Sequence, residues 1–347
     1  MSGRYDHKEL IRFCRDALVA EGLDPNHATV VAETLVEGDL LGHSTHGLAL
    51  LPRYLEEIAT GEMTRAGEPT VINDSGASVA WDGHYLPGPV LVRRALALCA
   101  ERARRHGVAT VAIGRSHHVA CLAAYLKAAT DQGLAAIVAS SSPNNASVAP
   151  FGAVEGVYSP NPLAAGWPTG GDPVLIDVST SITTSSLTSE VAAAGGRLPG
   201  KWVIGSDGDP VDDPAVLTAS PPGALLPLGG TDHGHKGFAL GMMVEMLTSG
   251  LAGQGRAERP SRWGASVFIM AIDPEHHGGR IAFERQTGSL VAACQAARPS
   301  PGGQPVRLPG QRALELRRTA LVEGVALPHI LIDRLRKAST VVFPQSR

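Results

Sequence analysis

The sequence has no Cys-x-x-Cys pair, no long apolar run and no large excess of either charge. Its four cysteines lie far apart among apolar residues, and we expect them to be small core residues rather than disulfide or zinc ligands. No stretch approaches about 18 consecutive apolar residues, so we expect no membrane span. The polar start is not followed by an apolar segment, so we expect no signal peptide. The net charge is −3, which gives no support for a nucleic-acid partner, since nucleic-acid binding normally requires a basic surface. We therefore expect a cytoplasmic protein that contacts neither membranes nor nucleic acids.

Two nucleotide-binding motifs are also absent. Neither the dinucleotide-binding pattern Gly-x-Gly-x-x-Gly nor the P-loop pattern Gly-x-x-x-x-Gly-Lys-Ser/Thr occurs anywhere in the 347 residues. What the chain does have is an ordinary globular composition, with 44% hydrophobic and 18% charged residues. This length and composition are sufficient for one large domain or two ordinary ones.

Apolar periodicity predicts helices at both ends of the chain and an α/β region between them. One N-terminal helix begins at Asp24-Pro25, and another runs from Thr45 with Pro52 as a kink. The unit strand 108–113, helix 119–132, strand 134–139 implies parallel pairing. We also expect strands at 69–73, 77–82, 174–178 and 265–272, and helices at 89–106, 236–249, 313–322 and 328–337. The terminal helices are expected to pack together as one helical subdomain, comprising residues 1–70 and 311–347.

A Gly-His-Ser-Thr-His-Gly segment at 42–47 precedes an apolar-periodic run. A side-chain oxygen of Ser44 or Thr45 is suited to cap the helix that follows. His46 would then lie near the positive end of the helix dipole, which favours its neutral form. A neutral imidazole beside a hydroxyl can accept or deliver a proton near neutral pH. The segment is either a catalytic site or the start of a well-capped helix that carries exposed polar side chains. Both interpretations stay open on these residues alone.

Three further polar segments follow expected strands, at the sheet edge where α/β proteins bind ligands. They are 115–118, 140–145 and 177–180. Each has an ordinary alternative, since buried histidines are often core residues and Ser, Asn and Asp are common in turns. A fourth segment, 229–237, places glycines and Lys236 at the start of a long helix. It suits an anion or a pyrophosphate, or it is a flexible connection.

His46, His118 and Lys236 are each expected at the beginning of a helix, where free N–H groups attract negative charge. If these starts converge, they form a pocket for a phosphorylated cofactor together with a carboxylate substrate. Pairs of histidines also raise the question of a metal site, at His43/His46, His117/His118, His233/His235 and His276/His277. No Asp or Glu accompanies the first two pairs, and no known zinc spacing occurs, so we expect no metal.

Taken in order, six segments resemble the type-2 malate/L-lactate dehydrogenase family, which includes ureidoglycolate and L-sulfolactate dehydrogenases. The resemblance covers essentially the whole chain and implies a layered α/β fold like that of L-sulfolactate dehydrogenase. Such a fold binds a nicotinamide cofactor without a Rossmann unit, here in residues 71–310, and this explains the missing glycine motif. The resemblance also implies a homodimer. The six segments are GHSTHGLALLPRYL (42–55), GRSHHVACLAAYL (114–126), VAPFGAVEGVYSPNPLA (148–164), LIDVSTS (175–181), GALLPLGGTDHGHKGFALGMMVEML (223–247) and VRLPGQ (306–311).

The family that the chain resembles transfers a hydride between NAD or NADP and C2 of a small 2-hydroxy or 2-oxo acid, or of its imine equivalent. By position, His46 would donate or accept the substrate proton, Thr45 would serve in a hydroxyl relay, and His118 would lie beside nicotinamide and substrate. The resemblance implies cofactor contacts at Ser142, Asp177, Val178, Ser179, His235, Lys236, Pro309, Gly310 and Gln311.

The substrate side departs from the family pattern. Several members have an Arg four residues after the catalytic His, which pairs with the substrate carboxylate, and here this position is Leu50. An alkyl chain does not replace a bidentate guanidinium, so either Arg53 takes over or the substrate differs. The usual Thr-Asn-Pro reads Pro160-Asn161-Pro162, with Asn161 left as a substrate contact, and the segment after Asp177 ends at Leu187 rather than at a charged residue.

We therefore expect an NAD- or NADP-dependent oxidoreductase acting on a small 2-hydroxy/2-oxo acid. A cyclic-imine carboxylate reductase is the alternative within the fold, because His46 can deliver a proton to nitrogen as well as to oxygen. Two interpretations of another class stay open. One is a metal-dependent hydrolase that uses the histidine pairs. The other is a cofactor-binding protein that has lost catalysis through Leu50, Pro160 and Leu187.

Overall fold

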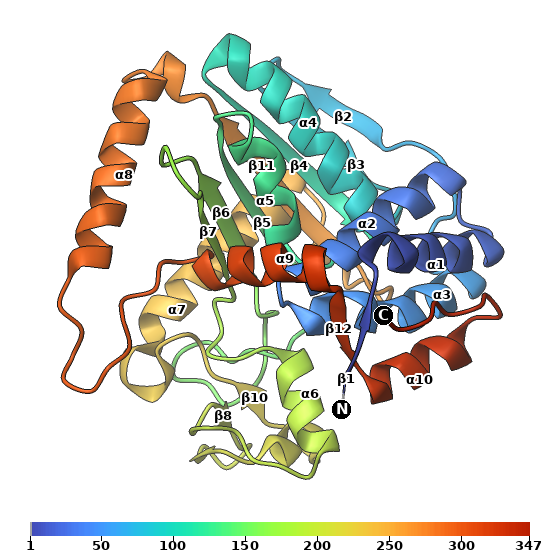
Figure 1. Cartoon of the computed structure of the whole chain (residues 1–347). Helices are drawn as coiled ribbons and strands as arrows, with labels where there is room; N and C mark the ends of the chain where they lie inside the picture. The colour runs from blue at the N-terminus through green and yellow to red at the C-terminus, as the bar shows by residue number, and fades with distance from the viewer. Residues whose placement is uncertain (1) are drawn as a thin grey trace.

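The computed structural model describes residues 2–347 and is built on a seven-stranded sheet with the order β2-β3-β4-β11-β5-β6-β7 (Figure 1). Only β3 and β4 pair in parallel, and every other neighbouring pair in this sheet is antiparallel. The expected parallel pairing of β4 with β5 is wrong, because β11 lies between them. The strands are β2 (Thr70–Asp74), β3 (Ser78–Asp82), β4 (Val108–Ser116), β11 (Ala265–Ile272), β5 (Ala135–Ser141), β6 (Leu163–Trp167) and β7 (Val174–Val178).

The α-helices form where apolar periodicity predicts them, with two additions. The two additions are α6 and α8, and neither packs an apolar stripe into the core, because α8 buries none of its residues and α6 buries only Thr188. Within residues 2–347, no helix is long and apolar enough to cross a membrane. The helices are α1 (His7–Ala20), α2 (Pro25–Leu40), α3 (Leu51–Ala59), α4 (Gly88–His106), α5 (Ala123–Thr130), α6 (Ser185–Ala193), α7 (Gly230–Glu245), α8 (Arg280–Ala296), α9 (Gln311–Glu323) and α10 (His329–Ala338).

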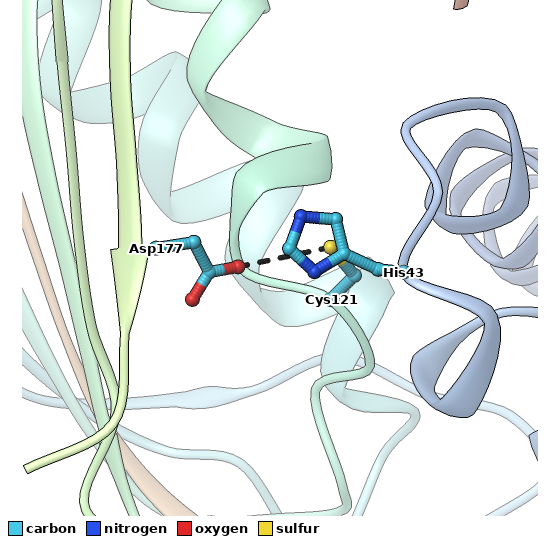
Figure 2. A group of neighbouring side chains, drawn as sticks. All are labelled: His43, Cys121 and Asp177. Carbon is cyan, nitrogen blue, oxygen red and sulfur yellow. Dashed lines mark hydrogen bonds between the residues drawn. The ribbon is translucent and has the colours of Figure 1, made fainter. Parts of the chain in front are cut away.

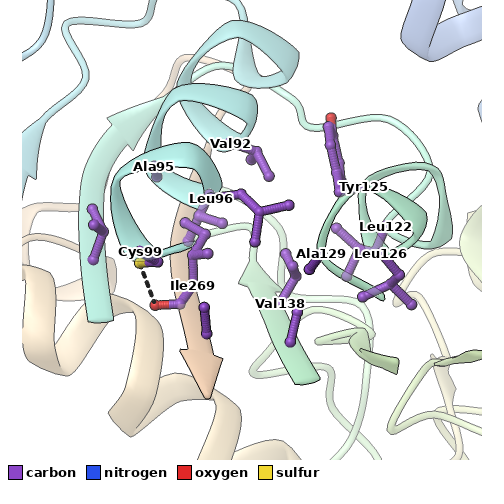
Figure 3. Close-up of a cluster of buried hydrophobic side chains, with 14 of the residues drawn as sticks. Val92, Ala95, Leu96, Cys99, Leu122, Tyr125, Leu126, Ala129, Val138 and Ile269 are labelled. Atoms are coloured by element: carbon purple, nitrogen blue, oxygen red, sulfur yellow. Dashed lines mark hydrogen bonds between the residues drawn. The ribbon is translucent and has the colours of Figure 1, made fainter. Parts of the chain in front are cut away.

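The central strand β11 is buried on both faces. Val267 and Ile269 point toward α4 and α5, which cover one face of the sheet (Figure 3). Phe268 and Met270 point to the opposite face, where Phe268 packs with Val244 of α7. Residues alternate between faces along a strand, and a strand that is apolar on both faces is most stable in the middle of a sheet. This apolar sequence explains why β11 separates β4 from β5.

Both ends of the chain pack together as a helical subdomain, as predicted. Its apolar core joins α1–α3 to α10 and includes Leu18, Tyr54 and Leu335. The strand β1 (Ser2–Tyr5) pairs antiparallel with β12 (Val325–Pro328) and ties the two ends together. Ala120, in the loop between β4 and α5, belongs to this core. The subdomain therefore rests on the loop that carries His118, while its boundaries at residues 70 and 311 remain a prediction.

The segment after Gly42 does not form the single capped helix that was expected. Two 3-10 turns, Ser44–His46 and Leu48–Leu50, precede α3, and no side-chain hydrogen bond caps either turn. Pro52 lies in the first turn of α3, where its missing N–H breaks no helical hydrogen bond, so it does not kink the helix. Gly47 separates the two turns. This position requires glycine, because a Cβ there would overlap the carboxylate of Asp39.

A small three-stranded sheet and α6 form a further part of the fold. The sheet has the order β10-β8-β9, with β8 (Val203–Ile204), β9 (Pro210–Val211) and β10 (Ala224–Leu225). It lies with α6 at the bottom of Figure 1. The start of α6, at Ser185 and Ser186, reaches the same cavity as the helical subdomain. Three parts of the fold therefore meet around one cavity.

Candidate active site

A cavity of about 390 Å³ lies at the sheet edge where β4, β5 and β7 end. The loop before α3, the β4–α5 loop and the segment before β6 complete its wall. All three polar segments predicted at this edge contribute to it, together with the 42–47 segment. The cavity collects these candidate residues: Thr45, His46, Arg53, His118, Ser142, Asn161, Asp177 and Ser179.

The remaining cofactor candidates lie outside the lining of this cavity. Val178 is exposed on β7, between the two lining residues Asp177 and Ser179. His235 and Lys236 are exposed on α7, just after a break in its helical geometry. Residues 309–311 pack beside β7, where the N–H of Leu175 donates to the carbonyl of Pro309 at 3.4 Å.

The expected convergence of three helix starts is wrong, although two of the three side chains, His46 and His118, do meet. The rings of His46 and His118 lie 6.1 Å apart between centroids, at an angle of 25°. Lys236 does not line their cavity. His46 ends a 3-10 turn, and His118 lies in the loop ahead of α5, so neither histidine begins a helix. Packing between the subdomain and the sheet brings the two rings together.

His46 has the surroundings of a neutral proton carrier. The Thr45 hydroxyl lies 2.8 Å from its Nδ1 atom. Burial lowers the pKa of His46, while the nearby Asp177 carboxylate acts in the opposite direction. Burial raises the pKa of Asp177. The neutral form of His46 therefore results from burial rather than from the helix dipole that the sequence suggested.

His118 is held by contacts on several sides. The Tyr54 hydroxyl lies 2.9 Å from its Nδ1 atom, and the Trp263 ring stacks on it at 4.5 Å between centroids. Behind the loop lies Gly88, where a Cβ would come within 2.4 Å of the His118 carbonyl oxygen. Burial holds the pKa of His118 well below its usual range. The adjacent His117 is the core histidine of the pair, because it is fully buried and does not line the cavity.

A guanidinium lies beside the position where the family arginine is missing. Leu50 lines the cavity, and so does Arg53, one turn further along. The Arg53 guanidinium carbon lies 3.4 Å from the centroid of Trp263. Trp263 thus contacts both Arg53 and His118. The sequence around Trp263 contains no motif, so nothing in the sequence predicts Trp263 as a site residue.

Comparison with known proteins identifies the family. The profile of the malate/L-lactate dehydrogenase family matches residues 5–336. The chain belongs to this family. It is 31% identical over 307 residues to L-lactate dehydrogenase of Cupriavidus necator, covering 86% of this chain and 87% of that protein. It is 32% identical over 345 residues to the Delta(1)-pyrroline-2-carboxylate/Delta(1)-piperideine-2-carboxylate reductase of Pseudomonas syringae pv. tomato, covering 95% of each.

The fold of this dehydrogenase family member agrees with a solved structure as well. Sulfolactate dehydrogenase from Methanocaldococcus jannaschii superposes with a TM-score of 0.85 at 23% identity, covering 97% of this chain and 96% of that one. The predicted L-sulfolactate dehydrogenase-like α/β fold is therefore confirmed. The relatives are named dehydrogenases and reductases, so the chain is an oxidoreductase of a nicotinamide-dependent family.

In this oxidoreductase, a buried carboxyl beside the loop that carries His46 predicts a pH effect on stability. Asp39 accepts a 2.7 Å hydrogen bond from the N–H of Leu48, and burial raises the pKa of its carboxyl to about 7. The folded state therefore holds this proton more tightly than the unfolded state, whose carboxyl titrates near pH 4. Stability from this group is fully present below about pH 4 and falls as the pH rises to about 7.

Asp39→Asn should remove this dependence. Between pH 5 and pH 8, the free energy of unfolding of the wild type is expected to fall by about 2–4 kcal/mol relative to the variant. Urea unfolding of both proteins at the two pH values measures the difference. Asp74→Asn is the control, because Arg102 lowers the pKa of Asp74 to about 2 and the group does not titrate in this window. A constant difference between wild type and Asp39→Asn would contradict the prediction.

Proposed function

We propose that this chain is an NAD- or NADP-dependent dehydrogenase of small 2-hydroxy acids, in which His46 carries the substrate proton. The observation that carries the proposal is the pairing of two half-buried histidines in one cavity that Arg53 also lines. Burial lowers the pKa of both imidazoles. Such a cavity suits a substrate with an oxygen to be protonated and a carboxylate to be bound.

The wall of the cavity has the chemistry of a nicotinamide-cofactor site. It is rich in hydroxyls and amides, which suit the hydrogen bonds of a ribose and a carboxamide. We assign cofactor contacts to Ser142, Asp177 and Ser179 in the cavity, and to Val178 and residues 309–311 along β7. His235 and Lys236, exposed on α7, would contact a part of the cofactor that extends beyond the cavity. The bound cofactor would supply or accept the hydride at C2 of the substrate.

His46 accepts and donates the proton of the substrate hydroxyl. When the Thr45 hydroxyl accepts a hydrogen bond from Nδ1–H, Nε2 of His46 is left as the base. In the oxidation direction, Nε2 takes the proton of the substrate hydroxyl, and the Asp177 carboxylate stabilises the imidazolium that forms. In the reduction direction the same imidazolium returns the proton to the substrate oxygen. His118 would orient that oxygen, Asn161 would contact the substrate, and Arg53 would bind its carboxylate.

Titration with NADH and NADPH tests the proposal. Fluorescence of the purified protein is expected to report binding of at least one cofactor, and nicotinamide absorbance is expected to report turnover across a panel of 2-oxo acids. Binding without turnover on any oxo acid or imine would point instead to a protein that has lost catalysis. Failure to bind either cofactor would contradict the proposal.

A cyclic-imine carboxylate reductase is the second candidate. It is favoured by the 32% identity to the Pseudomonas syringae reductase and by the absence of an arginine at Leu50. The comparison that separates the two is kcat/KM for Δ1-pyrroline-2-carboxylate against kcat/KM for pyruvate and oxaloacetate in the same assay. A ratio that favours the imine by tenfold or more would replace the first proposal by the second.

We also propose that the enzyme is a homodimer. Two helices expose apolar side chains that no part of residues 2–347 covers: α8 exposes Ile281 and Leu290, and α7 exposes Met242 and Met243. Figure 1 shows α8 standing apart from the body of the molecule. Sedimentation equilibrium is expected to give twice the mass of the 36.0 kDa chain, and Leu290→Glu is expected to shift it toward the monomer. A monomeric wild type would contradict the proposal.

A further inference from the structure

Three metal-binding side chains meet on the wall of the active-site cavity. Figure 2 shows His43, Cys121 and Asp177 pointing toward one another from three separate segments: the loop before the first 3-10 turn, the loop before α5, and the end of β7. One ligand atom of each residue lies within 4.8 Å of the other two. The Cys121 Sγ atom and an Asp177 carboxylate oxygen are 3.7 Å apart.

The donor set is that of a zinc site. Imidazole, thiolate and carboxylate are the three side-chain ligands that Zn²⁺ takes in proteins, and three protein ligands leave a fourth position open. Zinc bonds of about 2.0–2.3 Å place tetrahedral ligand atoms roughly 3.5 Å apart. The longest distance between ligand atoms must therefore shorten by about 1 Å. A change of rotamer of the half-buried His43 side chain can bring its ring nitrogen that much closer.

Electrostatics favours an ion at this point. Without an ion, the Cys121 thiol donates to the Asp177 carboxylate at 3.7 Å. A dication would take the place of that proton and would attract both the carboxylate and the thiolate that forms on binding. On binding, the Cys121 thiol would release its proton to solvent as the sulfur–metal bond forms. The backbone N–H of Ala123 donates to Asp177 at 2.8 Å and already orients the carboxylate.

We propose that His43, Cys121 and Asp177 bind one Zn²⁺ ion, with its fourth position open to the cavity, and that the ion inhibits the enzyme. All three ligands line the cavity that contains His46. A coordinated Asp177 no longer stabilises a charged His46, because its negative charge is shared with the metal. The ion also occupies space beside the reacting atoms. Binding of the ion is independent of the proposed function, whereas the inhibition rests on it.

Cobalt substitution tests the site without an activity assay. Co²⁺ added to the metal-free, full-length protein is expected to give a thiolate-to-cobalt charge-transfer band at one equivalent, and Zn²⁺ is expected to abolish the band. Cys121→Ser should lose the band, whereas Cys294→Ser, which changes a thiol on α8, should keep it. His43→Ala, at a half-buried position, should weaken Co²⁺ binding at least about 10-fold, and circular dichroism confirms that each variant is folded.

Two results would overturn the site: no charge-transfer band in the wild type, or a band that survives in folded Cys121→Ser. Inhibition is tested separately with Zn²⁺ in the NAD(P)H assay. Zn²⁺ is expected to inhibit the wild type reversibly, with activity restored by EDTA, and the His43→Ala variant should need at least about 10-fold more Zn²⁺. A cobalt band without inhibition would overturn the inhibitory role. An enzyme with no turnover on any substrate would overturn the proposed function while leaving the cobalt result in force.

Discussion

His46→Ala is expected to lower kcat by at least about 10²-fold, the usual contribution of a positioned general acid or base. The imidazole is the group beside the Thr45 hydroxyl and near Asp177, so its removal leaves no positioned group for the proton that moves with the hydride. Cofactor binding should change little, because the Ser142 and Ser179 wall is untouched. Steady-state kinetics in both directions, together with NADH and NADPH titration, measure the two effects separately.

His277→Ala is the matched control, because it removes an exposed imidazole outside the cavity. It is expected to leave kcat unchanged. A thermal melt of His46→Ala close to that of the wild type shows that the fold is intact, so the loss can be assigned to chemistry. Near-normal kcat in a folded His46→Ala would remove this residue from the mechanism and leave His118 as the proton carrier.

The acid side of the pH profile follows from the same surroundings. Burial lowers the pKa of His46, so the base that accepts the hydroxyl proton stays neutral to lower pH than an ordinary histidine. Oxidation of the 2-hydroxy acid should therefore lose rate only below about pH 6.5, the ordinary histidine value. Thr45→Val removes the hydroxyl 2.8 Å from Nδ1. We expect this variant to have a lower kcat than the wild type, although His46 remains as the base.

The sequence predicts the candidate site better than it predicts the sheet. His118 and Ser142 follow apolar strands, and Asp177 lies at the end of one. Ends of strands that run in the same direction meet at one edge, so their proximity follows from local patterns. The neighbour of each strand does not follow in this way. The position of β11 depends on which two strands pair with its two edges while helices cover its two apolar faces. That choice is made by long-range packing.

Other features leave no local signal. Trp263 contacts both Arg53 and His118, yet nothing in its neighbourhood in the sequence marks it as a site residue. The His43, Cys121 and Asp177 cluster comes from three distant segments and so has no spacing that a motif can describe. The helix α8 buries none of its residues, so it lacks the buried stripe by which a core-facing helix is recognised. These three cases depend on contacts that only the folded structure brings together.

Arg53→Met is expected to lower kcat/KM for 2-oxo acids by about 10–100-fold, mostly through KM. Charge-assisted hydrogen bonds contribute about 1.5–3 kcal/mol, and about 1.4 kcal/mol corresponds to a factor of ten. Arg53 lines the cavity, and its guanidinium lies against the face of Trp263. Its Nε–H donates to Glu57 at 3.4 Å, and its terminal N–H groups would bind the substrate carboxylate. Arg53→Lys should recover only part of the loss, because an ammonium group binds a carboxylate at one point. Arg12→Met, an exposed position on α1, is the control and should have no effect.

The exchange of two neighbouring positions separates anchoring by Arg53 from a general effect of charge. The double variant Leu50→Arg/Arg53→Leu restores the arrangement of the family relatives that have the arginine four residues after the catalytic histidine. Since Leu50 and Arg53 both line the cavity, the double variant should regain most of the kcat/KM lost in Arg53→Met. It should also change the preferred length of the oxo acid, because the positive charge moves by one helical turn. Equal kcat/KM values for Arg53→Met and the wild type would show that the substrate carboxylate binds elsewhere, and substrates without a carboxylate would then be tested next.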